Sequence, residues 1–79
     1  MISVTLPRLS ISMEEGKVLR WLVPDGAEVD AGQPIVEIET DKVEMQIEAP
    51  VSGVLREVLV GIDEDAPVGA TLGLIEPFV

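Results

Sequence analysis

The residues that this chain lacks exclude several kinds of chemistry. Its 79 residues contain no cysteine, no histidine and no tyrosine, and its aromatic residues are one tryptophan and one phenylalanine. Without cysteine there is neither a disulfide framework nor a thiol nucleophile. Without histidine the chain lacks the usual general base and the commonest metal ligand. A hydrophobic core must therefore be built from Val, Ile, Leu and Met.

Positive charge is scarce as well. Five Lys and Arg residues stand against fifteen Asp and Glu residues, which gives a net charge of −10. Nucleic acids and anionic membrane surfaces bind clustered cations, so neither is an expected partner. No apolar run approaches the length that spans a membrane, and the N-terminus lacks the features of a secretory signal. We expect one small domain, residues 1–79.

Short alternating segments, separated by Gly and Pro, indicate an all-β fold. Period-two alternation is clearest in residues 35–49, where apolar and acidic residues take turns. Regularly spaced short strands of this kind predict a β-sandwich or β-barrel. The remaining candidate strands cover residues 2–6, 18–23, 54–60 and 71–76.

The chain also repeats itself. "VLRWLV" (18–23) matches "VLREVL" (54–59) at an offset of 36, and "AGQPIVEIE" (31–39) matches "VGATLGLIE" (68–76) at an offset of 37. Two similar halves predict quasi-two-fold symmetry, with the turn at Lys42 at one end and both termini at the other. The alignment of Trp21 with Glu57 suggests a partly exposed Trp21. The buried face of 18–23 and 54–59 is left open, and a β-bulge in each would resolve it.

Lys42, one of only two lysines, falls at the centre of a predicted hairpin. Antiparallel strands 36–40 and 43–47, joined by Asp41 and Lys42 in a type I turn, would place Lys42 at a protruding apex. By position alone, a lysine at a hairpin tip is usually just a solvated charge. The predicted register puts three pairs on the core face and two on the solvent face: Thr40–Val43, Ile38–Met45 and Val36–Ile47 inside, with Glu39–Glu44 and Glu37–Gln46 outside.

The residues around Lys42 resemble a known family. The stretch "ETDKV" (39–43), followed by "APVSGVL" (49–55) and preceded by a similar segment over 6–39, resembles the lipoyl domains of 2-oxo acid dehydrogenase complexes, carried by dihydrolipoamide acyltransferase subunits. The resemblance covers nearly the whole chain. It implies an all-β flattened barrel, a barrel-sandwich hybrid of two four-stranded antiparallel sheets. It also implies lipoic acid in amide linkage to Lys42.

The resemblance further implies a carrier that is not itself an enzyme. The lipoyl group would be reductively acylated by a thiamin-diphosphate 2-oxo acid dehydrogenase. It would deliver the acyl group to coenzyme A at an acyltransferase core and be reoxidised by dihydrolipoamide dehydrogenase. A lipoate ligase or octanoyl- or lipoyl-transfer enzymes would attach it, recognising Asp41 and Val43. Glu39 is a further candidate recognition residue. The resemblance also leads us to expect a monomeric domain, in the bacterial cytoplasm or the mitochondrial matrix after removal of a transit peptide.

A second recognition element is implied by resemblance in the loop of residues 8–15, named the 8–15 loop below. In the family this surface loop lies near the lysine hairpin, where the dehydrogenase distinguishes its own domain. An ordinary exposed loop is the competing interpretation. The candidate residues are Leu9, Ser10, Ile11, Ser12, Met13, Glu14 and Glu15.

Three alternatives compete with the lipoyl interpretation. A biotinyl carrier shares the fold but has its lysine between two methionines, whereas Asp41 and Val43 flank Lys42. An enzyme using carboxylates of "DED" (63–65) or of the hairpin would need burial to separate their pKa values, and exposed loops do not supply it. An unmodified interaction module would not need Lys42. The parent complex is also open. The stretch "SISM" (10–13) resembles pyruvate-type domains except that Ile11 replaces a proline, whereas Val43 resembles the 2-oxoglutarate type, and branched-chain and acetoin complexes are further candidates.

Overall fold

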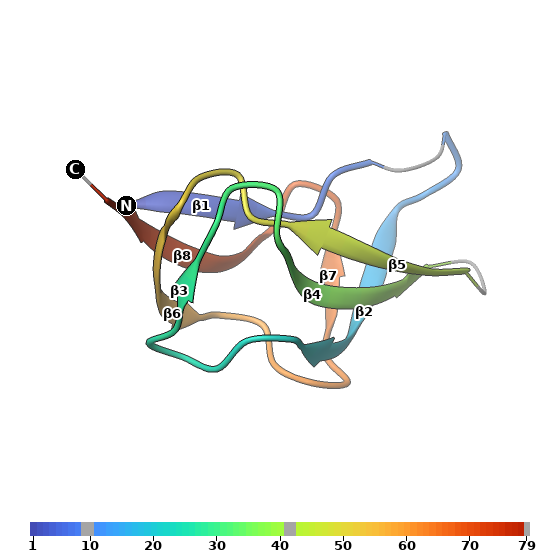
Figure 1. Cartoon of the computed structure of the whole chain (residues 1–79). Coiled ribbons are helices and arrows are strands. Elements are labelled where there is room, and N and C mark those ends of the chain that lie inside the picture. The colour runs from blue at the N-terminus through green and yellow to red at the C-terminus, as the bar shows by residue number, and fades with distance from the viewer. Residues whose placement is uncertain (9–10, 41–42, 79) are drawn as a thin grey trace.

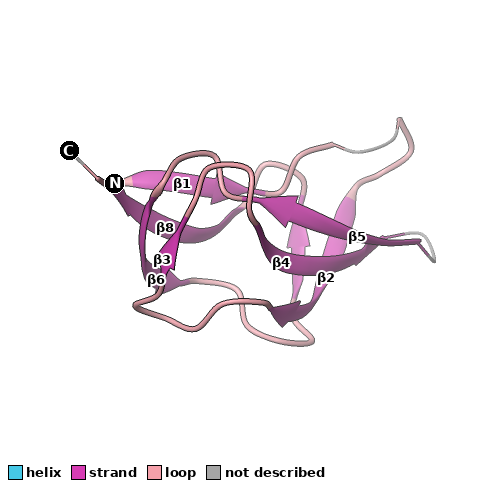
Figure 2. Cartoon of the chain, viewed as in Figure 1, coloured by secondary structure: helices cyan, strands magenta, loops and turns pink. Residues whose placement is uncertain are grey.

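In the described part of the chain, eight β-strands form two four-stranded antiparallel sheets (Figures 1 and 2). The structure is a computed structural model, and it describes residues 1–8, 11–40 and 43–78. One sheet has the strand order β1-β8-β6-β3 and the other the order β5-β4-β2-β7. The strands are β1 (Ile2–Thr5), β2 (Glu15–Trp21), β3 (Glu28–Val29), β4 (Pro34–Thr40), β5 (Val43–Glu48), β6 (Gly53–Val58), β7 (Asp65–Pro67) and β8 (Thr71–Pro77).

This architecture confirms the predicted all-β fold of two four-stranded antiparallel sheets. The sheets remain separate, so the molecule is a sandwich and not a closed barrel. Strands β3 and β7 were not predicted, because two and three residues are too few to show a period-two pattern. Among the described residues there is no helix long and apolar enough to cross a membrane.

The two halves of the chain are related by quasi-two-fold symmetry, as the repeat predicts. Equivalent loops make equivalent backbone hydrogen bonds: Leu22 N–H donates to Ile35 O at 2.8 Å, and Leu59 N–H donates to Leu72 O at 2.9 Å. Each pair is related by an offset of 37. The offset of 36 predicted for residues 18–23 and 54–59 is therefore wrong by one residue, because similar letters were aligned there instead of equivalent backbone positions.

A β-bulge in each half resolves which face of residues 18–23 and 54–59 is buried. The register shifts between Val18 and Arg20 where β2 pairs with β4, and between Leu55 and Glu57 where β6 pairs with β8. Each bulge adds one residue to its strand and so turns the following side chains to the other face. The bulges that the sequence required are thus confirmed.

Trp21 follows the bulge in β2 and is half-buried, as expected. Its indole N–H donates to Val60 O at 2.9 Å, which satisfies the polar end of the ring while its carbon atoms pack against the core. The core lies between the two sheets and takes side chains from both halves. Its buried members are Val4, Leu6, Met13, Val18, Val29, Ile35, Val36, Ile38, Ile47, Ala49, Leu55, Ala66, Leu72 and Ile75.

The molecule is elongated, with extents of 37 × 21 × 17 Å. In Figure 1, β4 and β5 run to one end, whereas the start of β1 and the end of β8 lie together at the other. This arrangement agrees with the prediction that the hairpin and the termini occupy opposite ends.

Candidate functional site: the β4–β5 hairpin and the loop beside it

The β4–β5 hairpin has the predicted register. Thr40 pairs with Val43, and the four pairs behind them are Glu39–Glu44, Ile38–Met45, Glu37–Gln46 and Val36–Ile47. Register is well determined here because a slip of one residue would bring glutamates to the core face. Since the last pair is Thr40–Val43, two residues remain to join the strands. These are Asp41 and Lys42, and both lie outside the described residues.

The inner face of the hairpin becomes more exposed toward its end. Ile38 and Ile47 are buried, Met45 is half-buried, and Val43 is 54% exposed. The prediction that Val43 belongs to the core is therefore wrong. β5 is an edge strand that pairs only with β4, and the hairpin extends past the elements that cover its base. The hairpin thus presents its final residues to solvent on both faces.

The outer face of the hairpin is acidic but partly compensated. Glu37 Oε1 accepts a hydrogen bond from Arg20 Nε at 2.6 Å, and its Oε2 accepts one from Gln46 Nε2 at 3.3 Å. The Arg20 hydrogen bond, followed by that of Gln46, lowers the pKa of Glu37, and Glu37 in turn raises the pKa of Arg20. Glu39 and Glu44 face each other and are exposed. Sequence reasoning missed the role of Arg20, because the bulge in β2 decides which face Arg20 occupies.

The described residues of the 8–15 loop lie at the same end of the molecule as the hairpin (Figure 1), and the last of them, Glu15, is the first residue of β2 and not part of a loop. A shallow hollow of about 240 Å³ separates them and is lined by loop residues 12–15 and by Thr40 of β4. Ile11 is 97% exposed, and Ser12, Glu14 and Glu15 are exposed as well. Leu9 and Ser10 lie outside the described residues.

Met13 differs from its neighbours in the 8–15 loop, because it is only 2% exposed and belongs to the core. A partner would therefore meet the surface around Met13 and not its side chain. The resemblance placed Met13 among recognition residues, and its burial gives it the role of an anchor for the loop.

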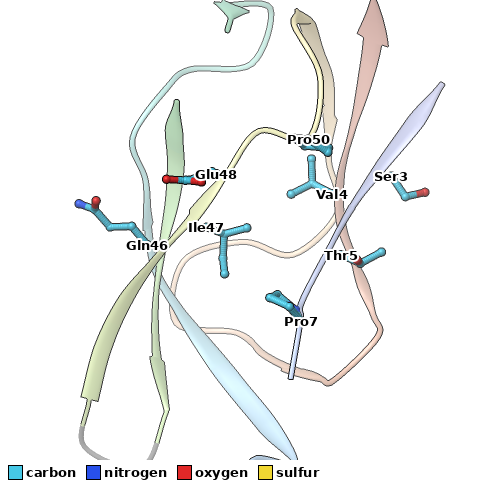
Figure 3. A pocket seen from close by; sticks show the side chains of 8 residues that line it. All are labelled: Ser3, Val4, Thr5, Pro7, Gln46, Ile47, Glu48 and Pro50. Carbon is cyan, nitrogen blue, oxygen red and sulfur yellow. The ribbon is translucent and has the colours of Figure 1, made fainter. Parts of the chain in front are cut away.

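A second hollow, of about 330 Å³, lies between the edge strands β1 and β5 (Figure 3). Residues from both halves line it, among them Val4 and Pro7 from the first half and Ile47 and Pro50 from the second. It lies along the seam between the sheets, away from the end of the hairpin. Its lining contains one acidic residue, Glu48, and no cation.

The other carboxylates considered as catalytic candidates have ordinary surroundings. Asp63, Glu64 and Asp65 are exposed, and the Glu64 carboxylate accepts the N–H of Gly61 within a turn. Among the described residues no group of three or more acidic side chains is arranged to hold a metal ion. The hairpin and the 8–15 loop are thus the candidate site.

Comparison with known proteins agrees with this choice. A family model described as "Biotin-requiring enzyme", for biotinyl and lipoyl attachment domains, matches residues 2–75. An acetoin-cleaving-system dihydrolipoyllysine-residue acetyltransferase from Pseudomonas putida is 42% identical over 73 residues, which cover 92% of this chain and 20% of the relative. The corresponding component of the pyruvate dehydrogenase complex of Mycobacterium bovis is 47% identical over 74 residues, which cover 91% of this chain and 13% of the relative.

A third curated relative belongs to another complex. The succinyltransferase component of the 2-oxoglutarate dehydrogenase complex of Bacillus subtilis is 39% identical over 75 residues, covering 95% of this chain and 18% of the relative. The chain therefore spans a fifth or less of the length of these three curated relatives.

Solved structures separate the fold from the family. A domain of the Kluyveromyces lactis urea carboxylase superposes with a TM-score of 0.80 at 21% identity, covering 95% of this chain and 6% of that one, which shows the fold alone. The lipoyl domain of the 2-oxoglutarate dehydrogenase complex of Azotobacter vinelandii superposes with a TM-score of 0.77 at 32% identity and covers 96% of both chains. The chain therefore belongs to the biotinyl/lipoyl attachment family, as a lipoyl domain of the kind found in acyltransferase components of 2-oxo acid dehydrogenase complexes.

Proposed function

We propose that Lys42 bears the lipoyl group, in amide linkage to its side-chain amine, and that the domain carries acyl groups between the enzymes of a 2-oxo acid dehydrogenase complex. The observation that carries this proposal is the Thr40–Val43 pair, which closes a hairpin at the end of the molecule opposite the termini. It leaves Asp41 and Lys42 to join the strands. An amide-linked group needs an accessible primary amine, and Lys42 would supply one at the end of this hairpin.

The surroundings of the hairpin end fit an extended, solvated cofactor. Val43, Glu39 and Glu44 are exposed, so the described residues next to the attachment point face solvent. When bound, lipoate supplies a dithiolane, the redox-active sulfur that a chain without cysteine lacks. The protein's own contribution is position: β4 and β5 hold the attachment point beyond the core, and tethering raises its effective concentration at the partner sites.

The identity of the attached group is supported by the residues beside Lys42. Biotinyl domains place a methionine on each side of the lysine, whereas this chain has Asp41 and Val43, and Met45 lies half-buried on β5. The dehydrogenase, the acyltransferase core, dihydrolipoamide dehydrogenase and the attaching enzyme are the partners that this role requires. The relatives come from acetoin, pyruvate and 2-oxoglutarate systems, so each of these dehydrogenases is a candidate donor.

The first test is the mass of the protein after incubation with a lipoate ligase, ATP and lipoate. We expect one lipoyl increment on the parent chain and on Lys17→Arg, and none on Lys42→Arg, because an arginine is not acylated at neutral pH. The Lys17→Arg variant is a matched control, since Lys17 is the other lysine and lies exposed on β2. In a parallel incubation with a biotin ligase, ATP and biotin, a biotin increment on the parent chain, with binding to avidin, would contradict the lipoyl assignment.

The second test follows acyl transfer to the lipoylated chain. It is incubated in turn with the purified dehydrogenase components of acetoin, pyruvate and 2-oxoglutarate systems, each supplied with its own radiolabelled substrate: acetoin, pyruvate or 2-oxoglutarate. We expect one dehydrogenase to label it much faster than the others, and no label on Lys42→Arg. Absence of labelling by all three, with lipoylation verified by mass, would contradict the carrier role in these complexes.

A further inference from the structure

We propose that Arg8 is a positioning residue, which holds the 8–15 loop so that Ile11 is presented to the dehydrogenase as an apolar contact. This inference rests on the proposed carrier function. It assigns a role to a residue outside the attachment site, and it defines what the partner must offer: an apolar depression with basic side chains at its border.

The guanidinium of Arg8 closes the loop through its carbonyls. Arg8 Nη1 donates to Met13 O at 2.7 Å and to Ile11 O at 3.2 Å. Hydrogen bonds from a charged donor are stronger than neutral ones, and the rigid guanidinium fixes the direction of both. In the described part of the chain the ion pairs are Arg20–Glu37 and Arg56–Glu76, so Arg8 directs its charge to these carbonyls and not to a carboxylate.

The backbone before Arg8 and after Met13 is hydrogen-bonded to the rest of the protein. Leu6 N–H donates to Ala70 O at 3.0 Å, and Val68 N–H donates to Glu14 O at 3.0 Å. The side chains of Leu6 and Met13 are both buried. Because Leu6 and Met13 are anchored, the hydrogen bond from Arg8 to Ile11 O adds a further fixed point for the backbone at Ile11.

Ile11 is the most exposed of the large hydrophobic side chains in the described residues. It is 97% exposed, compared with 68% for Met1, the next highest. Burying such a side chain against a partner removes apolar surface from water and so favours binding. Arg8, which orients the backbone at Ile11, therefore affects binding without contacting the partner itself.

The placement of the loop links Ile11 to the chemistry at the hairpin. The hollow lined by residues 12–15 and Thr40 sets the loop directly beside the end of β4. An enzyme that reaches the hairpin end therefore approaches the loop as well. Glu14 in the loop and Glu15 at the start of β2 are exposed, and their carboxylates, within a chain of net charge −10, favour a basic border on the partner.

The decisive measurement is the kinetics of reductive acylation of lipoylated variants, with the dehydrogenase that labels the parent chain fastest. We expect Arg8→Ala and Ile11→Ser each to raise the KM for the domain about tenfold, equivalent to about 1.4 kcal/mol, with kcat unchanged. Arg8→Lys should recover part of the loss, because a lysine can still donate to one carbonyl. The double variant should cost less than the sum of the two single changes, since both act on one contact.

Arg56→Ala is the matched control. Arg56 is also an exposed arginine, but it lies on β6 in the other sheet and pairs with Glu76 at 2.8 Å. Its removal changes the net charge equally and should leave KM within twofold of the parent value. A KM that rises as much in Arg56→Ala as in Arg8→Ala would show a general charge effect and would overturn the proposal.

Two further readouts separate positioning from loss of structure. In the unlipoylated domain, the amides of residues 11–13 should exchange hydrogen faster in Arg8→Ala than in the parent, while amides of β4 and β8 stay unchanged. If the exchange rates of these amides are the same in Arg8→Ala and in the parent, the proposal that Arg8 positions the loop is overturned. If Arg8→Ala fails to fold, Ile11→Ser decides, because a 97% exposed side chain contributes little to folding. Parent-like KM in Ile11→Ser overturns the inference while leaving the carrier function intact.

Discussion

At the scale of single residues, Arg20 has the clearest electrostatic effect. Its hydrogen bond and charge hold the pKa of Glu37 below the ordinary value of 4.5, so the ionised carboxylate is favoured in the folded protein. A carboxylate whose folded pKa is depressed stabilises the fold above the unfolded value of 4.5, and this contribution is lost as pH falls through the folded pKa. The effect therefore belongs to acid conditions, below about pH 4.5.

Arg20→Gln should move the Glu37 titration upward toward its ordinary value. The remaining hydrogen bond from Gln46 should keep the pKa of Glu37 slightly lowered. Carboxyl chemical shifts followed by NMR from pH 2 to 7 would measure this, with Arg56→Gln as a charge-matched control that leaves Glu37 unchanged. A Glu37 titration that is identical in the parent and in Arg20→Gln would show that the pair does not persist in solution.

At the scale of elements, the β4–β5 hairpin divides into a structural base and a presented end. Ile38 lies 1% exposed between the sheets, whereas Val43 is 54% exposed although it belongs to the same face. Both side chains satisfy the same alternating pattern. What differs is the presence of an opposing sheet, which covers the base and not the end.

Truncation of these two side chains should therefore have very different costs. Ile38→Ala should reduce the free energy of unfolding by about 2–5 kcal/mol, because it leaves a cavity in the core. Val43→Ala should cost less than about 1 kcal/mol. Urea unfolding followed by fluorescence of Trp21, the sole tryptophan, measures both. Similar losses for the two variants would mean that the end of the hairpin is packed in solution.

At the scale of the whole molecule, the two halves share a backbone plan but not its details. Gly26 has φ 90° and its equivalent at an offset of 37, Asp63, has φ 66°, so both halves use a left-handed residue at the same point of the fold. Aspartate tolerates this conformation better than most residues that carry a Cβ atom. The repeat therefore preserves backbone geometry where it does not preserve residue type.

Gly16 and Gly53 form an equivalent pair at the same offset, but the space available for a side chain differs between them. A Cβ atom at Gly53 would come within 2.2 Å of Glu76 O, whereas at Gly16 the nearest atom is Leu6 Cδ2 at 3.4 Å. Gly53→Ala should therefore lower the free energy of unfolding by about 3 kcal/mol, through backbone displacement between β6 and β8.

Gly16→Ala serves as the internal comparison and should change stability by less than about 1 kcal/mol. The same urea titration applies to both variants. Equal effects would contradict the asymmetry between the halves, since it rests on how closely β8 approaches β6 at Gly53.

The sequence by itself determined the hairpin and the position of its lysine. Alternation with period two, combined with apolar pairs on one face and glutamates on the other, permits a single register, and that register leaves Asp41 and Lys42 between the strands. The flanking motif then identified the family. These features are local, and local patterns depend only on residues that are close in the chain.

The tertiary structure decided what covers each face. Alternation distinguishes two faces of a strand but does not report which other elements pack on them, so the exposure of Val43 and the burial of Met13 could not be predicted. The bulge in β2 placed Arg20 against Glu37, 17 residues away. The Arg8 guanidinium donates to the backbone O of Met13, whose side chain is buried in the core. Each of these contacts depends on packing between segments whose sequences carry no mark of the pairing.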